Sequence, residues 1–221
     1  ERWSNEKIWY SSTFRSEGVY GIRSMADGVH YTSLEYTEDG NAVVKYAYRT
    51  GEAVDTLAKS TDIYGGPGRI SGYQFSADEQ QLLVSSGHES IYRHSYSASY
   101  HTYRLGSEEA GQPLLADEAK VRLATFSPTG DKVAYVRDNN LWVVSLDNGS
   151  APVQLTTDGR WNEVINGASD WVYEEEFGKD RGFFWSPNGQ RIAYYRYHES
   201  AVRECGMPMH GSLPTARYTS T

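Results

Sequence analysis

Cysteine, long apolar runs and clusters of basic residues are all scarce in this chain of 221 residues. With one cysteine, Cys205, the chain can form neither an internal disulfide nor a thiolate metal cluster. The apolar fraction is 38%, and runs such as residues 141–144 are far shorter than the roughly 20 residues that a membrane-spanning helix needs. The formal net charge is −8, and basic residues do not cluster along the sequence. Both features argue against nucleic acid as a partner.

Two kinds of site chemistry are also missing from the sequence. The six histidines are scattered without the spacings typical of a metal site, so we predict neither a metal nor a cofactor. A Gly-x-Ser-x-Gly motif, which carries the nucleophile of α/β-hydrolases, does not occur. The sequence therefore predicts no catalytic residue in this chain.

Aromatic side chains are abundant, with 18 Tyr, 6 Trp and 6 Phe. Tyrosine combines an apolar ring with a polar hydroxyl, which suits the half-buried surfaces of β-sheets. No 11-residue stretch has a sustained helical period, and no Pro/Ser-rich linker divides the chain. Composition thus favours an all-β structure.

A repeat recurs four times along the chain, each time beginning with an aromatic residue. Phe-Ser-Pro-Thr-Gly at residues 126–130 matches Trp-Ser-Pro-Asn-Gly at 185–189, and weaker copies begin at Phe75 and Tyr36. The intervals are 39, 51 and 59 residues. In the two stronger copies, Pro and Gly suit a tight turn, and a strand with apolar residues on both faces follows. Strand–turn–strand units of about 40–50 residues are typical of β-propeller blades.

Two segments interrupt this repeat, at about residues 87–105 and 158–184. The second contains three consecutive glutamates, Glu174, Glu175 and Glu176, among aromatic residues. On a strand, Glu175 and Glu176 would point to opposite faces, whereas on a helical turn they diverge by about 100° and could converge on one ligand. Neighbouring carboxylates repel each other, so a cation in reach would stabilise them. From these residues alone, a solvated acidic surface and an amine or metal site both stay open.

Residues 170–176 (Asp-Trp-Val-Tyr-Glu-Glu-Glu) resemble the signature of the dipeptidyl peptidase IV family of serine peptidases. Residues 92–100 (Tyr-Arg-His-Ser-Tyr-Ser-Ala-Ser-Tyr) resemble the arginine-bearing loop of the same family. The order of the two motifs, their separation and the turns between them also match. The resemblance covers about residues 22–197.

The resemblance implies a propeller that caps an α/β-hydrolase domain and an enzyme that removes dipeptides, with Pro or Ala second, from free N-termini. It implies that Glu175 and Glu176 bind the substrate's α-ammonium and that Arg93 donates hydrogen bonds to carbonyl groups of the bound dipeptide. Arginine suits this task because its donors form a planar fork. We therefore expect Arg93 to lie near both glutamates. The resemblance assigns structural support to four neighbours: Asp170, Trp171, Tyr173 and Glu174.

These observations predict that residues 1–221 are the N-terminal half of a propeller, with about four four-stranded blades, a short helical insertion near 170–177 and the hydrolase domain elsewhere. The implied partners are peptides with a free N-terminus, the enzyme's own hydrolase domain and a second copy in a homodimer. The implied location is secreted, periplasmic or membrane-anchored outside the cytoplasm. Two alternatives stay open: a non-catalytic peptide-binding or scaffold propeller, and a related peptidase that releases tripeptides.

Overall fold

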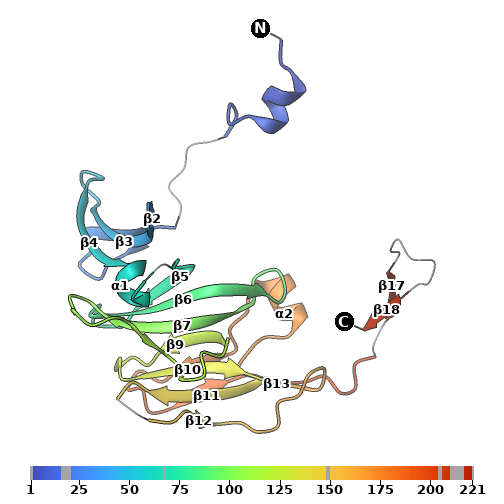
Figure 1. The fold of residues 1–221 in the computed structure, drawn as a ribbon. Helices are drawn as coiled ribbons and strands as arrows, with labels where there is room; N and C mark the ends of the chain where they lie inside the picture. Colours follow the sequence, from blue (N-terminus) through green and yellow to red (C-terminus); the bar gives the residue numbers. More distant parts are fainter. Residues whose placement is uncertain are drawn as a thin grey trace.

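A computed structural model describes residues 2–15, 21–66, 68–147, 150–203, 206–209 and 217–220 of the chain. Cys205 lies outside these described residues. None of the helices within them is long and apolar enough to cross a membrane. Strands dominate the structure, and Figure 1 shows them stacked as successive sheets.

Three four-stranded antiparallel sheets follow one another along the chain, each built from consecutive strands. The first contains β1 (Arg23–Ser24), β2 (His30–Thr37), β3 (Gly40–Ala47) and β4 (Ala53–Lys59). The second contains β5 (Gly72–Phe75), β6 (Gln81–Ser90), β7 (Tyr96–Arg104) and β8 (Gln112–Pro113). The third contains β9 (Arg122–Phe126), β10 (Lys132–Arg137), β11 (Asn140–Ser145) and β12 (Val153–Gln154). This order, strand after strand in one sheet, confirms the predicted propeller blades.

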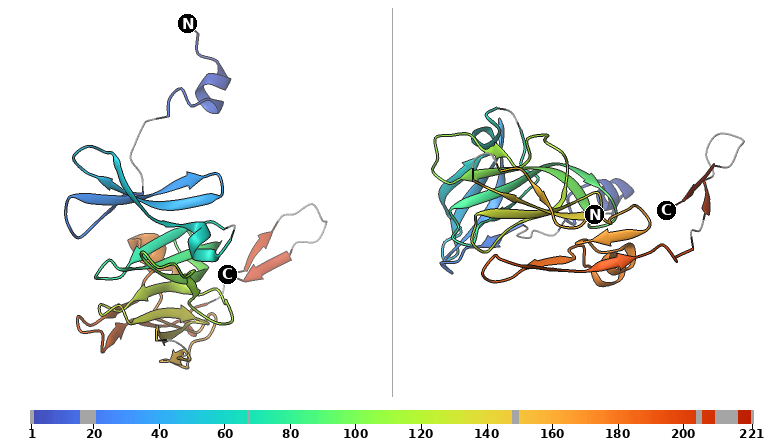
Figure 2. Two further views of the ribbon diagram at one scale, coloured as in Figure 1. Left: turned by 60° about the vertical axis from the view of Figure 1, so that its left-hand side comes forward. Right: turned by 90° about the horizontal axis from the view of Figure 1, so that it is seen from below.

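The remaining elements are short. A π-helical segment, η1 (Glu6–Tyr10), lies apart from the stacked sheets, and α1 (Ser60–Tyr64) joins the first sheet to the second (Figure 1). After the third sheet come β13 (Val164–Asn166), α2 (Trp171–Phe177), β14 (Phe183–Trp185), β15 (Ile192–Tyr194) and β16 (Arg196–His198). The hairpin of β17 (Gly206–Met209) and β18 (Arg217–Ser220) lies to one side of the stack in both views of Figure 2.

The repeated turns have the geometry that their residues predict. Gly130 and Gly189 both adopt the left-handed conformation, with φ of 74° and 67°, and each donates its N–H to the serine three residues earlier. In the weaker copy Glu79 occupies the same position with φ of 56°, and its N–H likewise bonds to Ser76. The turn is therefore kept even where glycine is replaced by a residue that adopts this conformation less easily.

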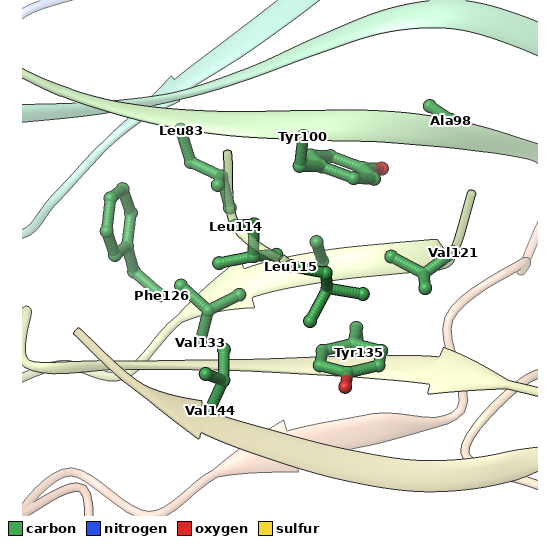
Figure 3. Packing of buried hydrophobic residues seen from close by; sticks show 11 residues of the cluster. Leu83, Ala98, Tyr100, Leu114, Leu115, Val121, Phe126, Val133, Tyr135 and Val144 are labelled. Atoms are coloured by element: carbon green, nitrogen blue, oxygen red, sulfur yellow. The ribbon is translucent and has the colours of Figure 1, made fainter. Parts of the chain in front are cut away.

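The central strands of the second and third sheets are buried on both faces, because each of these two sheets packs against two neighbours. In β6, Leu82 and Val84 join the cluster shared with the first sheet, whereas Leu83 joins the cluster shared with the third. In β10, Val133 and Tyr135 face the second sheet, while alternate residues face the segment after the third. Figure 3 shows the cluster between the second and third sheets. The continuous apolar runs of the sequence thus serve two interfaces each.

The fourth repeat differs from the predicted four-stranded sheet. Here β13 pairs with β16 and β14 pairs with β15, and these are two separate two-stranded ladders. Asn166 opposes Arg196 and Phe183 opposes Tyr194, so both ladders use the same partner segment, residues 192–198. The chain leaves this edge after Asn166, forms α2 and returns at Phe183. The inserted residues 167–182 interrupt the strand, which explains the departure from the predicted sheet.

Candidate functional site

Helix α2 is short but has a defined beginning and end. The Asp170 side chain caps it by accepting a hydrogen bond from the N–H of Tyr173 at 2.8 Å. At the other end Gly178 adopts the left-handed conformation with φ of 62° and donates its N–H to the Glu174 carbonyl at 3.0 Å. These local signals confirm the helical turn predicted for residues 170–177, and the capping contact is compatible with the supporting role expected of Asp170.

The three glutamates of α2 lie in three different environments. Glu174 is fully buried, with 0% of its surface exposed. The side chain of Glu175 is 14% exposed, and Glu176 is exposed. Because helical positions are separated by about 100° per residue, Glu175 and Glu176 do not point to the opposite faces that a strand would impose. The convergent arrangement of these two carboxylates is therefore compatible with the observed helix.

The arginine-bearing segment lies at the end of a long hairpin made by β6 and β7. A register shift between Ser86 and Glu89, with Gly87 at φ of 60°, lets the two strands continue beyond the rest of the sheet. The N–H of Ile91 then bonds to the Ser95 carbonyl at 2.9 Å and closes the tip. Residues 87–105 therefore extend the second blade, which corrects the prediction that they interrupt it.

Arg93 and Glu175 form a direct ion pair at this tip. The distance from Arg93 Nε to Glu175 Oε2 is 2.6 Å, although 82 positions separate them in sequence. The side chain of Arg93 is 72% exposed, so the pair reaches the surface, and Glu176, the next residue of α2, is exposed as well. The prediction that Arg93 lies close to this acidic pair is confirmed for Glu175. The cation relieves the repulsion between neighbouring carboxylates before any ligand binds.

Glu174 makes the second connection between the helix and the hairpin. Its Oε1 accepts hydrogen bonds from the backbone N–H groups of His94, at 2.7 Å, and Ser95, at 2.8 Å. Burial opposes ionisation of this carboxyl, but the hydrogen bonds from Ser95 and His94 and the charge of Arg122 outweigh it. The pKa of Glu174 consequently lies below its ordinary value.

The two aromatic residues expected to support the insertion behave differently. The Tyr173 ring packs against those of Phe177 and Tyr197, with both centroid distances 5.3 Å. Trp171, in contrast, is 53% exposed, and its expected role in packing the insertion stays a prediction. In a helix of two turns, the inward position is filled by Glu174, and Trp171 stays at the surface.

Arg122, on β9, is a site residue that sequence reasoning missed. Its Nε and Nη2 atoms are buried without a hydrogen-bond partner among the described residues. Burial lowers the pKa of Arg122, while the charge of Glu174 acts in the opposite direction. The signal in the sequence is a charged residue inside the apolar run of residues 121–124. Within the described ranges, no group of three His, Cys, Asp or Glu side chains forms a metal site.

Comparison with known proteins points to one family. Residues 76–220 match the family model described as "Dipeptidyl peptidase IV (DPP IV) N-terminal region". The chain is 42% identical over 165 residues to a probable dipeptidyl-aminopeptidase B of Podospora anserina, covering 69% of this chain and 17% of that protein. It is 33% identical over 172 residues to prolyl endopeptidase FAP of Homo sapiens, covering 76% of this chain and 22% of that protein.

A solved structure agrees with the sequence matches. The crystal structure of dipeptidyl peptidase 4 from Porphyromonas gingivalis superposes with a TM-score of 0.86 and 39% identity. The superposition covers 100% of this chain and 31% of the other. The chain thus spans about a fifth of the length of these two curated relatives and about a third of the solved structure.

Proposed function

Since this chain belongs to the dipeptidyl peptidase IV family and forms part of its N-terminal β-propeller region, we propose that Glu175, Glu176 and Arg93 anchor the N-terminus of a peptide substrate. The observation that carries this proposal is the 2.6 Å contact between Arg93 and Glu175, which joins the two family motifs into one surface site. The protein that contains this chain is then a serine exopeptidase that releases X-Pro or X-Ala dipeptides.

The chemistry of the site supports recognition of an α-ammonium group. A peptide N-terminus at neutral pH carries three N–H donors and a positive charge, and charge-assisted hydrogen bonds to carboxylates are among the strongest in proteins. Glu175 and Glu176 offer acceptors on one end of α2. The Arg93 contact with Glu175 uses its Nε–H, one of five donors on a guanidinium, so the planar terminal nitrogens suit the carbonyl oxygens of the same dipeptide.

Binding the ammonium at a fixed position sets which peptide bond reaches the nucleophile. In this proposal the hydrolase domain, outside the present chain, supplies the Ser, Asp and His residues and is the principal partner. The chain alone cleaves nothing, because a Gly-x-Ser-x-Gly motif is missing from its sequence. Location outside the cytoplasm and assembly into a homodimer belong to the same proposal.

The test is made on the full-length enzyme with Glu175→Gln and Glu176→Gln, each assayed on an Ala-Pro chromogenic amide with a free or an acetylated N-terminus. Each substitution removes charge and keeps shape. A hydrogen bond to a charged group contributes about 1.5–3 kcal/mol, so we expect kcat/KM on the free substrate to fall by about 10-fold to 150-fold, with reduced preference for the free N-terminus.

A matched control is Glu89→Gln, which removes a carboxylate from another 2.6 Å ion pair, with Lys120, on the same hairpin. Its kcat/KM should stay within about twofold, because exposed pairs contribute little. If Glu175→Gln and Glu176→Gln both keep full activity and full preference for free N-termini, the anchoring role is wrong and the glutamates are a solvated surface.

A further inference from the structure

Behind the exposed ion pair, the fully buried carboxylate of Glu174 joins α2 to the backbone of the hairpin tip. We propose that Glu174 is a positioning residue, which fixes Arg93 relative to Glu175 and Glu176, and that Arg122 supplies its counter-charge. This inference rests on the proposed function, since it concerns how Arg93 is held for its task.

The first argument is the position of the two donors. The N–H groups of His94 and Ser95 follow Arg93 directly in the chain, and both reach the same oxygen, Glu174 Oε1, at 2.7 and 2.8 Å. A carboxylate that accepts two backbone N–H groups from adjacent residues fixes the local backbone, and with it the direction in which the preceding side chain leaves. The exposed Arg93 side chain therefore starts from a backbone that Glu174 holds.

The second argument is the cost of burying the charge. Among the described residues, Glu174 is the one charged residue that is buried, with 0% of its surface exposed. An unpaired buried charge is strongly unfavourable. Its second oxygen, Oε2, lacks a hydrogen-bond partner among the described residues, as do the buried Nε and Nη2 of Arg122. The charge of each residue favours the ionised form of the other. The unpaired buried polar atoms of both side chains and this mutual attraction together support Arg122 as the counter-charge of Glu174.

The third argument is the sensitivity of binding geometry. Misplacement of a binding group by about 1 Å can reduce a rate by about 100-fold. The tip is anchored to α2 through two described contacts, the Arg93–Glu175 pair and the Glu174 hydrogen bonds. If the Glu174 hydrogen bonds are lost, only the Arg93–Glu175 ion pair of these two contacts still holds the tip. Arg93 is 72% exposed in that pair.

The test is a double-mutant cycle in the full-length enzyme with Arg93→Ala, Glu174→Gln and both together. Glutamine keeps the size and one acceptor of Glu174 but removes its charge. We expect kcat/KM for a free Ala-Pro amide to fall at least about 10-fold in each single variant. In the Arg93→Ala background, Glu174→Gln should change kcat/KM by less than about twofold, because its effect passes through Arg93.

A fully multiplicative cycle would overturn the positioning role while leaving the anchoring function intact. If Arg93→Ala has no effect on its own, the anchoring function itself is wrong for Arg93, so the two failures are distinguishable. Amide exchange adds a direct readout. Exchange at residues 93–95 should increase in Glu174→Gln without a matching change in the core strands of the third sheet, and unchanged exchange there would contradict the inference.

If Glu174→Gln fails to fold, Arg122→Gln enters the same cycle with Arg93→Ala. The expected result is again loss of kcat/KM in the single variant and less than about twofold further loss in the double variant. Arg122→Lys, which keeps the positive charge, should recover much of the activity. The matched control is Arg137→Gln, which removes a guanidinium paired at the surface with Asp117 and should leave kcat/KM within about twofold. An Arg122→Gln enzyme with unaltered kcat/KM would contradict the counter-charge role.

Discussion

Three identical residues in a row can have three separate roles when a helix turns them into different surroundings. Glu174 accepts two backbone hydrogen bonds in the interior, Glu175 pairs with Arg93, and Glu176 is exposed beside them. The sequence predicts the acidic cluster but not this division. Burial depends on which side of α2 meets the hairpin tip, and that contact is made by residues about 80 positions away.

The lowered pKa of Glu174 predicts how the site responds to acid. A carboxyl whose pKa is lower in the folded than in the unfolded state stabilises the fold above its ordinary value, near 4.5, and loses this contribution as the pH falls through the folded pKa. The contact between α2 and the tip should therefore persist at pH 5 and weaken on further acidification. Amide exchange at residues 93–95 of the full-length protein, corrected for intrinsic rates, measures this.

The same measurement on Glu174→Gln is the control, because this variant has no carboxyl to titrate at that position. Its tip should lose less protection on acidification below pH 5 than the wild-type tip does. Loss of wild-type protection already between pH 7 and pH 5 would contradict the assignment.

Among the elements, helix α2 is held in place by backbone hydrogen bonds at the two ends of its inserted segment, Gly167 and Gly182. Gly167 donates its N–H to the Tyr195 carbonyl at 3.1 Å, and Tyr195 donates its own N–H to the Gly182 carbonyl at 2.7 Å. Gly182 also donates to the Gly167 carbonyl at 3.1 Å. The hydrogen bonds thus hold the two ends of the inserted segment together, and we call this pair of glycines the neck. Gly167 has a positive φ of 77°, and Gly182 lies against the backbone of Ala168, so neither position favours a side chain.

Gly182→Ala is expected to displace the Glu175 and Glu176 side chains, although residue 182 makes no contact with them. A Cβ atom at residue 182 would lie 2.9–3.0 Å from backbone atoms of Ala168, which cannot move aside as a flexible side chain does. The neck must open, and α2 moves with it, so kcat/KM of the full-length enzyme should fall by at least about 10-fold, consistent with the sensitivity of rates to misplacement.

Gly178→Ala provides a comparison at the end of the same helix. No atom lies within 4 Å of a Cβ there, and only the left-handed backbone, with φ of 62°, opposes the change. We expect a smaller effect, on the order of 1 kcal/mol in stability. Equal losses of activity in the two variants would show that the neck has no special importance.

The hairpin of β6 and β7 is an element that the sequence does not predict. Residues 87–105 are rich in polar and aromatic side chains, a composition that is typical of a loop. The regular repeat also ends before this segment. The register shift at Ser86 and Glu89 changes which residues face inward, so the apolar alternation is broken while strand pairing continues. A bulge depends on pairing with the opposite strand, and local composition does not predict it.

At the scale of the whole molecule, the blades were predictable and the fourth unit was not. The turns of the repeat depend on local residues, such as Gly130 and Gly189, and two-sided burial follows from apolar runs in the strands. The split of the fourth sheet depends on pairings of residues 164–166 and 183–185 with one distant segment, which periodicity does not reveal. Arg122 and Glu174 lie on β9 and α2, about 50 positions apart in the sequence, so no local pattern links them either.

The stacking predicts that neighbouring residues of one strand stabilise different interfaces. Leu82 and Leu83 are 0% and 1% exposed, yet Leu82 belongs to the cluster with the first blade. Leu83 belongs to the cluster with the third blade, which Figure 3 shows. Leu82→Ala and Leu83→Ala in the full-length protein should each lower the free energy of unfolding by about 2–5 kcal/mol.

Local amide exchange separates the two variants. Faster exchange should appear in β3 for Leu82→Ala and in β10 for Leu83→Ala, each substitution acting as the other's control. The same exchange pattern in both variants would contradict the assignment of the two side chains to separate interfaces.

The interrupted strand has a consequence for how such a chain can diverge or be redesigned. Asn166 and Phe183 oppose residues only two positions apart, Arg196 and Tyr194, so pairing with residues 192–198 resumes close to where it stopped. The entropic cost of closing an insertion grows slowly with its length. Residues 168–181, between the two glycines of the neck, are therefore a cassette: a segment of another length or sequence can be grafted there, and the blade keeps its register while the recognition surface changes.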